Sequence, residues 1–336
     1  MLIDASLSHD LDGVEVEAAR LEAGGYDGLW LGETKHEPFL QLLRATEATS
    51  TITVGTAIAI AFARTPMTLA NAGYDMARYS KGRFVLGLGS QVKPHVERRF
   101  SMPWSHPAPR MREIVLALRA IWDSWQEGTQ LNFRGDFYTH TLMTPFFAPP
   151  AHEYGPPPIF LAGVGERMTE VAGEVADGFF FHPFTTDDYL RQVTLPALLR
   201  GRARADKADL DGFTLAGPAF ACFGRTEEEL ARAVKGTKER IAFYASTPTY
   251  RPVLDRLGCG ELQPELTRMS KDGRWSDMGD AIDDELLNAF AVVGTPEEVG
   301  RGLAERWGAV ATRLSIYVNF PTDPLSVLRV AAAARG

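Results

Sequence analysis

The sequence lacks several features that would assign it to a specialised class of protein. It has only two cysteines, Cys222 and Cys259, and two thiols so far apart suit a reducing compartment better than a disulfide framework. No run of about eighteen apolar residues is present, so we expect no membrane-spanning helix. The first residues show no signal-peptide pattern, and we expect a cytoplasmic protein.

Positive charge and metal-binding patterns are also scarce. The net charge of -8 argues against a nucleic-acid partner. The seven histidines form no His-x-x-x-His pair, and two cysteines alone could not build a zinc site. We therefore expect no metal, no nucleic acid and no membrane as partners.

The chain does contain short apolar runs that end in glycine or in a polar residue. The clearest covers residues 83–90, where the run ends in Gly-Leu-Gly-Ser and continues into the polar residues 91–99. Buried parallel strands whose C-terminal ends open into a site show this pattern. Eight runs are candidate strands: residues 2–7, 28–31, 53–58, 84–88, 159–161, 178–181, 215–223 and 313–318.

Segments with helical periodicity separate these runs. They cover residues 14–23, 38–49, 66–79, 109–125, 167–175, 186–205, 227–244 and 296–307. Helices between apolar strands favour right-handed crossovers and a parallel sheet. Because 45% of the 336 residues are hydrophobic, the chain can bury a large core. The pattern predicts an α/β fold, a (β/α)8 TIM barrel with its chemistry at the C-terminal strand ends.

Two segments do not fit the repeat. Residues 130–141 alternate around Arg134-Gly135-Asp136 and predict a hairpin. Residues 247–288 are too long for a plain connection, and we predict a partly helical insertion over the C-terminal mouth of the barrel. No low-complexity linker divides the chain, so we predict one domain, residues 1–336.

Several motifs, taken in order, resemble one known family. They are residues 24–30 (GGYDGLW), 54–58 (VGTAI), 64–70 (RTPMTLA), 80–89 (SKGRFVLGLG), 133–138 (FRGDFY), 162–165 (AGVG) and 293–296 (VGTP). The chain resembles the bacterial luciferase-like superfamily of TIM barrel flavin and deazaflavin enzymes. Within it, the chain is most similar to oxidoreductases that use the deazaflavin coenzyme F420.

The resemblance implies where the cofactor ring binds. In this family the ring lies at the C-terminal mouth, supported by a bulge with a non-proline cis peptide after the third strand, here near Ala57-Ile58. Gly89 and Ser90, at the end of the fourth strand, are expected at the same site. The alternative for residues 57–58 is an ordinary buried strand end.

The resemblance also implies a phosphate site at Ala162, Gly163, Val164 and Gly165. Independently, glycines let backbone amides approach an anion, and the following helix offers unpaired N–H groups and a positive dipole end. The alternative is a tight turn that needs glycine for its positive φ. Arg167 at the helix start could add a charge-assisted bond or point to solvent.

Candidate catalytic residues are Glu33, His36 and His182, with His9 after the first strand as a further candidate. Related dehydrogenases carry an Asp-His pair after the second strand; Glu33 takes the Asp position, and His36 lies close to the position of the missing His. The alternatives are a helix-start carboxylate beside Pro38 for Glu33, an exposed loop for His36, and a hydrogen-bonded wall for His182.

The chain departs from the dehydrogenase pattern after the fourth strand. Gln91 stands near the place of a glutamate acid, so a mechanism that uses that acid cannot be transferred. We expect Gln91 to hydrogen-bond the ring or the ribityl chain of the cofactor. A basic cluster follows at Lys93, His95, Arg98 and Arg99, which either meets the anionic tail of the cofactor or forms a solvated helix start.

These features predict an F420-dependent oxidoreductase that transfers a hydride between the deazaflavin and a small organic substrate. The first alternative is an FMN-dependent monooxygenase, and the second is a barrel that binds the cofactor without turnover. A homodimer is expected.

Overall fold

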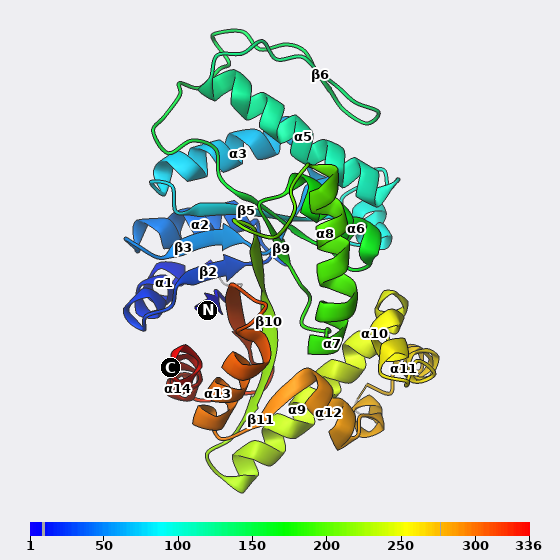
Figure 1. Ribbon diagram of the computed structural model, residues 1–336. Helices are drawn as coiled ribbons and strands as arrows, with labels where there is room; N and C mark the ends of the chain where they lie inside the picture. Colours follow the sequence, from blue (N-terminus) through cyan, green and yellow to red (C-terminus); the bar gives the residue numbers. More distant parts are fainter. Residues whose placement is uncertain (9–10, 276) are drawn as a thin grey trace. The chain divides into compact units, whose positions relative to one another are not determined.

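The structure is a computed structural model that describes residues 1–8, 11–275 and 277–336 (Figure 1). The chain forms two compact units. The N-terminal unit comprises residues 5–180 and 197–214, and the C-terminal unit comprises residues 1–4, 181–196 and 215–336. His9 lies outside the described residues. The prediction of a single domain stays a prediction.

The N-terminal unit contributes parallel strands in the order β2-β3-β5-β8-β9. Its strands are β2 (Gly28–Leu31), β3 (Thr53–Thr56), β5 (Phe84–Gly89), β8 (Ile159–Ala162) and β9 (Gly178–Phe180), and the short β4 (Ala59–Ile60) pairs with β5. All residues of β2 and β5 are buried. Burial on both faces explains why these strands read as continuous apolar runs.

Helices cover these strands. They are α1 (Val14–Ala23), α2 (Pro38–Glu47), α3 (Pro66–Tyr79), α4 (Lys93–Arg98), α5 (Pro107–Gln126) and α6 (Glu166–Val175), and α8 (Leu195–Arg204) runs from one unit into the other. Figure 1 shows α3 beside β5 with α5 packed against it, and the buried indole of Trp122 donates to the carbonyl of Ala70 at 3.1 Å. The predicted hairpin is confirmed as β6 (Phe133–Arg134) and β7 (Thr139–His140).

The C-terminal unit contributes parallel strands in the order β11-β10-β12-β1, with residues 2–4 of β1 in this unit. Its strands are β11 (Ala291–Gly294), β10 (Thr214–Phe223), β12 (Arg313–Tyr317) and β1 (Leu2–Ser6). Its helices are α7 (Asp187–Tyr189), α9 (Glu227–Ala245), α10 (Arg251–Arg256), α11 (Leu262–Lys271), α12 (Asp284–Phe290), α13 (Pro296–Trp307) and α14 (Pro324–Arg335).

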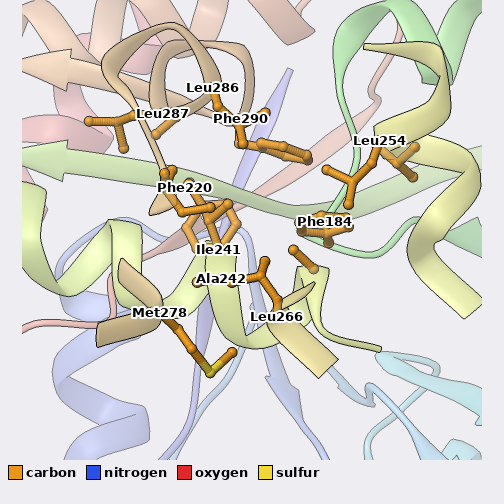
Figure 2. Close-up of a cluster of buried hydrophobic side chains, with 14 of the residues drawn as sticks. Phe184, Phe220, Ile241, Ala242, Leu254, Leu266, Met278, Leu286, Leu287 and Phe290 are labelled. Carbon is orange, nitrogen blue, oxygen red and sulfur yellow. The ribbon is translucent and has the colours of Figure 1, made fainter. Parts of the chain in front are cut away.

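One hydrophobic cluster forms the core of this unit (Figure 2). Phe220 from β10 and Ile241 from α9 pack with Leu254 from α10 and Leu266 from α11, and Phe184 stacks on Phe290 at 4.4 Å between ring centroids. The segment 247–288 is therefore partly helical, as predicted, and its helices supply part of this core. Its predicted place over the barrel mouth stays a prediction.

The structure differs from the predicted elements in several places. The third strand is divided into β3 and β4 at residues 57–58. Strand β11 was not predicted, because a four-residue apolar run carries little periodicity. Helix α14 was also missed, although its Ala-rich sequence and the Asp323 cap were available signals. No helix in the described residues is long and apolar enough to cross a membrane.

Candidate functional site

The predicted cofactor-binding residues gather at one edge of the sheet in the N-terminal unit. Strand β5 lies between β3 and β8, with Val54 opposite Phe84 and Leu88 opposite Leu161. Because the strands are parallel, their C-terminal ends lie at the same edge. Residues 57–58 follow β3, and residues 89–90 and 162–165 begin at the last residues of β5 and β8, so the three predicted segments are neighbours.

The peptide bond between Ala57 and Ile58 is cis, at the predicted position. The backbone beside it is closely packed: a Cβ on Gly87 would lie 1.8 Å from the carbonyl oxygen of Thr56, and one on Gly89 would lie 2.8 Å from Cγ1 of Ile58. The Thr56 hydroxyl donates to the Gly87 carbonyl at 2.7 Å and accepts from the Gly87 amide at 2.9 Å. The strand ends are thus fixed by close packing and by the hydrogen bonds of the Thr56 hydroxyl.

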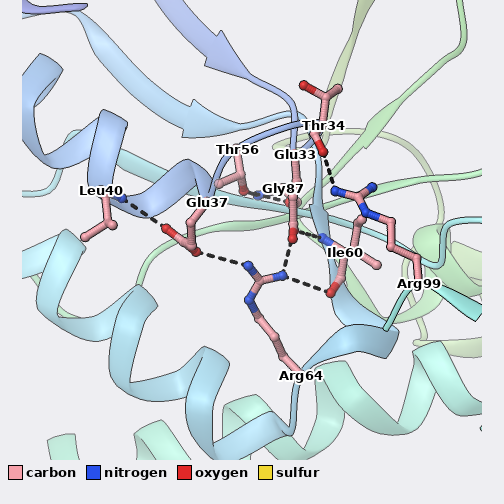
Figure 3. A network of polar contacts seen from close by, with 9 residues as sticks. All are labelled: Glu33, Thr34, Glu37, Leu40, Thr56, Ile60, Arg64, Gly87 and Arg99. Carbon is pink, nitrogen blue, oxygen red and sulfur yellow. Dashed lines mark hydrogen bonds and ion pairs between the residues drawn. The ribbon is translucent and has the colours of Figure 1, made fainter. Parts of the chain in front are cut away.

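A network of ion pairs and hydrogen bonds involves residues that follow β2 and β3 (Figure 3). The carboxylate of Glu33 accepts from the Ile60 amide at 2.8 Å and from Nη1 of Arg64 at 2.6 Å. The Glu33 amide donates to the Ile58 carbonyl at 3.0 Å. Arg64 also donates to Glu37 at 3.0 Å. The Glu33 side chain is only 6% exposed, so the network anchors the segment that contains Ile58.

The structure shows which glutamate caps the start of helix α2. Helix α2 is capped by Glu37, whose carboxylate accepts from the Leu40 amide at 3.1 Å, and not by Glu33. The helix-start interpretation of Glu33 is therefore wrong. His36 is exposed on the loop that precedes α2.

The residues after β5 occupy an exposed turn and the short helix α4. Gln91 adopts a left-handed conformation with φ of 60°, and its side-chain oxygen accepts from the Val92 amide at 2.9 Å. Its amide nitrogen therefore remains the group that could reach a ligand. In the basic cluster, Lys93 lies 3.8 Å from Glu97, and Arg99 donates to the Thr34 carbonyl. Half of the cluster is thus engaged with the protein.

The glycine turn after β8 leads directly into α6. Gly165 is the N-cap residue with φ of 90°, and no side chain caps the helix. Val164 and Gly165 are exposed. A Cβ on Gly163 would lie 2.5 Å from Cγ of Met168. Both glycines therefore have a structural need, and the exposed turn also leaves the first amides of α6 open to an anion.

The remaining candidate catalytic residue, His182, belongs to the C-terminal unit. His182 Nδ1 accepts from the Phe184 amide at 3.1 Å, and Nε2 lies 3.0 Å from the hydroxyl of Tyr250. The Tyr244 ring packs edge-on against the imidazole at 4.8 Å, and its hydroxyl lies 2.9 Å from that of Tyr317. One histidine and three tyrosines thus form what we call the tyrosine cluster.

The hydrogen bonds of His182 determine its protonation. Since Nδ1 accepts a backbone N–H, the neutral ring carries its hydrogen on Nε2 and donates to Tyr250. Burial lowers the pKa of His182 to about 4, so the imidazole is neutral near pH 7. Burial also raises the pKa of Tyr250 to about 12, which keeps its hydroxyl protonated.

Sequence reasoning missed the partners of its own candidates. Arg64 belongs to the motif of residues 64–70, but no pattern in the sequence pairs it with Glu33. Tyr244, Tyr250 and Tyr317 come from three separate elements, and no spacing rule joins them to His182. A surface groove of about 490 Å³ along α9 contains none of the predicted site residues. In the described part of the chain, no group of three or more His, Cys, Asp or Glu could hold a metal.

Known structures define the fold. The coenzyme F420-dependent tetrahydromethanopterin reductase from Methanopyrus kandleri superposes with a TM-score of 0.78 over 98% of this chain and 96% of that one, at 20% identity. The chain therefore has the (β/α)8 TIM barrel fold that the sequence predicted.

Sequence comparison defines the family. The luciferase-like monooxygenase pattern matches residues 5–313, and the chain belongs to this family. An uncharacterised protein of Mycobacterium tuberculosis is 51% identical over 93% of this chain and 92% of its own length. The 5,10-methylenetetrahydromethanopterin reductase of Archaeoglobus fulgidus is 26% identical over 90% of this chain and 88% of its own length.

Proposed function

We propose that this protein is an F420-dependent oxidoreductase that transfers a hydride between the deazaflavin and a small organic substrate. The observation that carries the proposal is the arrangement of the three adjacent strand ends, β3, β5 and β8, in a member of this family. The reductase relatives support the redox class: one is named a methylenetetrahydromethanopterin reductase, and the structural neighbour is described as F420-dependent.

The residues present fit such a cofactor. The uncapped start of α6 and the exposed turn at Val164 and Gly165 suit a phosphate, because backbone N–H groups and the helix dipole both favour an anion there. Ala57 and Ile58 would support the ring, with Gly89, Ser90 and the amide of Gln91 beside it. The cofactor, when bound, supplies the hydride chemistry, and the protein supplies binding and orientation.

The chain's own groups limit where a proton could come from. Glu33 is held by Arg64 and the Ile60 amide, so we assign it a positioning role at the ring-binding edge. His36 is exposed, and it remains the candidate for proton transfer in the N-terminal unit. His182 is neutral and donates to Tyr250, so it would act on a substrate only through that hydroxyl.

An FMN-dependent monooxygenase is the second candidate, favoured by the family to which the chain belongs. The two candidates differ in the cofactor, because deazaflavin has carbon where flavin has N5 and reacts poorly with oxygen.

Titration of the purified protein with coenzyme F420 and with FMN separates the candidates. We expect the F420 dissociation constant to be at least about tenfold lower, a difference of roughly 1.4 kcal/mol. Tight FMN binding without measurable F420 binding would move the assignment to the monooxygenase. Saturable binding of neither cofactor would remove both.

A further inference from the structure

Two hydrogens of the tyrosine cluster have no hydrogen-bond acceptor among the described residues. The three hydroxyls and Nε2 of His182 bring four hydrogens. Nε2–H donates to Tyr250, and one hydroxyl of the Tyr244–Tyr317 pair donates to the other. Two hydrogens therefore remain, the one on Tyr250 and one from the pair. No acceptor for them is found among the residues that the structure describes.

The surroundings favour a ligand that is mostly apolar. The ring centroid of Phe184 lies 5.6 Å from that of Tyr250 and 6.3 Å from that of Tyr244. The ring centroid of Phe220 lies 5.0 Å from that of Tyr317. His182 and the three tyrosines are only partly exposed. Ligand sites commonly combine such aromatic walls with a few converging polar groups that fix the orientation of the ligand.

The donors converge from four parts of the C-terminal unit. His182 follows the Phe181 that begins this unit's second segment, Tyr244 lies in α9, Tyr250 ends η3 (Pro248–Tyr250) and Tyr317 ends β12. The guanidinium of Arg240 lies 6.0 Å from the centre of the Tyr244 ring and adds positive charge. A group that accepts hydrogen bonds, and that tolerates or carries negative charge, matches this arrangement.

We propose that the tyrosine cluster is a binding site for a carbonyl or carboxylate oxygen of a small planar molecule. The hydroxyl of Tyr250 and one hydroxyl of the Tyr244–Tyr317 pair donate to that oxygen. His182 is a positioning residue: its Nε2–H occupies a lone pair of the Tyr250 hydroxyl and thereby directs the Tyr250 hydrogen toward the ligand. This site deepens the proposed function and rests on it, because it names the chemical class of the substrate group that would meet the Tyr250 hydroxyl.

The test uses fluorine NMR titrations of the full chain without cofactor. 4-Fluorobenzoate and 4-fluoroacetophenone are the probes, a carboxylate and a ketone on the same ring, and 4-fluorobenzylamine is a control that offers only donors at neutral pH. We expect saturable binding of at least one acceptor probe and weaker or no binding of the amine. Comparison of the two acceptors tells whether charge contributes.

Variants identify the donors. Tyr250→Phe and the double variant Tyr244→Phe/Tyr317→Phe should each raise the dissociation constant of the acceptor probe at least about fivefold, because each removes one of the two hydrogens that the ligand would accept and keeps the rings. Tyr154→Phe, an exposed tyrosine in the N-terminal unit, should leave it unchanged. His182→Gln keeps a side-chain N–H and should retain more affinity than His182→Leu.

Each result either supports the site or removes it. If neither acceptor probe binds saturably, or if the folded Tyr250→Phe and double variants bind it like the wild type, the proposal is wrong. If His182→Leu and His182→Gln behave alike, the positioning role of His182 is wrong. F420 titration of the same variants keeps this result apart from the proposed function, since cofactor affinity is expected to stay constant in all of them.

Discussion

The two polar clusters of this protein differ in charge and in how completely their hydrogen-bond donors are paired. The Glu33–Arg64 network is charged, and its donors and acceptors are matched with one another and with the backbone of Ile60 (Figure 3). The tyrosine cluster is neutral, and two of its hydroxyl hydrogens have no acceptor among the described residues.

The difference indicates what each cluster does. Removing one member of a matched, charged network lowers the free energy of unfolding strongly, because the remaining buried charge is left without its partner. Such a network suits the role of holding a strand end in place. Removing one hydroxyl from a neutral cluster lowers the free energy of unfolding less. The hydrogens that have no acceptor in such a cluster can form hydrogen bonds with a ligand that accepts them. The following predictions test that contrast.

The largest effect is expected for Arg64→Ala. The variant leaves the Glu33 carboxylate, only 6% exposed, without its guanidinium partner, and breaking a buried pair in this way costs about 3 kcal/mol or more. Urea unfolding followed by circular dichroism measures the loss. The control is Arg232→Ala, which breaks an exposed pair with Glu228 and should cost less than about 1 kcal/mol. Equal costs for the two variants would contradict the structural role of the network.

The next effect concerns the pH dependence of stability that His182 imposes. Its pKa is about 4 in the folded protein and about 6.5 as a free side chain, so the unfolded chain binds the proton more readily. The contribution is complete above about pH 6.5 and disappears as the pH falls toward about 4. Between about pH 7.5 and about pH 5 the wild type should lose about 2 kcal/mol that His182→Gln does not lose.

Urea unfolding of both proteins at the two pH values gives this difference directly. Carboxylates and the other histidines titrate in both proteins, so their effects cancel in the comparison. The same slope with pH in wild type and variant would show that His182 is not held in its neutral form.

A smaller effect, on cofactor affinity, is expected at the glycine turn of residues 162–165. Val164 is exposed and its neighbours Gly163 and Gly165 are structurally required, so a charge at Val164 tests anion binding without straining the turn. Val164→Asp should weaken binding of coenzyme F420 at least about tenfold, or roughly 1.4 kcal/mol. The loss should shrink as salt screens the repulsion. Val16→Asp, exposed on α1, is the matched control. A salt-independent loss, or none, would place the phosphate elsewhere.

The same contrast explains what could be read from the sequence. Hydrophobic periodicity is local, and it predicted the eight strands, the principal helices and the hairpin. The edge of β3, β5 and β8 was also predictable, because parallel strands align their C-terminal ends. The partner of Glu33 lies 31 residues away, and the partner of His182 lies 68 residues away. Side-chain pairing over such separations depends on the folded backbone and leaves no periodic signal.

The smallest effect is expected for Tyr250→Phe in the absence of any ligand. The variant removes the hydroxyl that accepts the Nε2–H of His182, while the stacking of the two rings at 4.6 Å is kept. A typical hydrogen bond contributes about 1 kcal/mol to the free energy of unfolding, and we expect a loss of that size. Urea unfolding near neutral pH checks this. A loss as large as that of Arg64→Ala would mean that the tyrosine cluster, like the Glu33 network, holds the fold together, and the contrast between the two clusters would no longer stand.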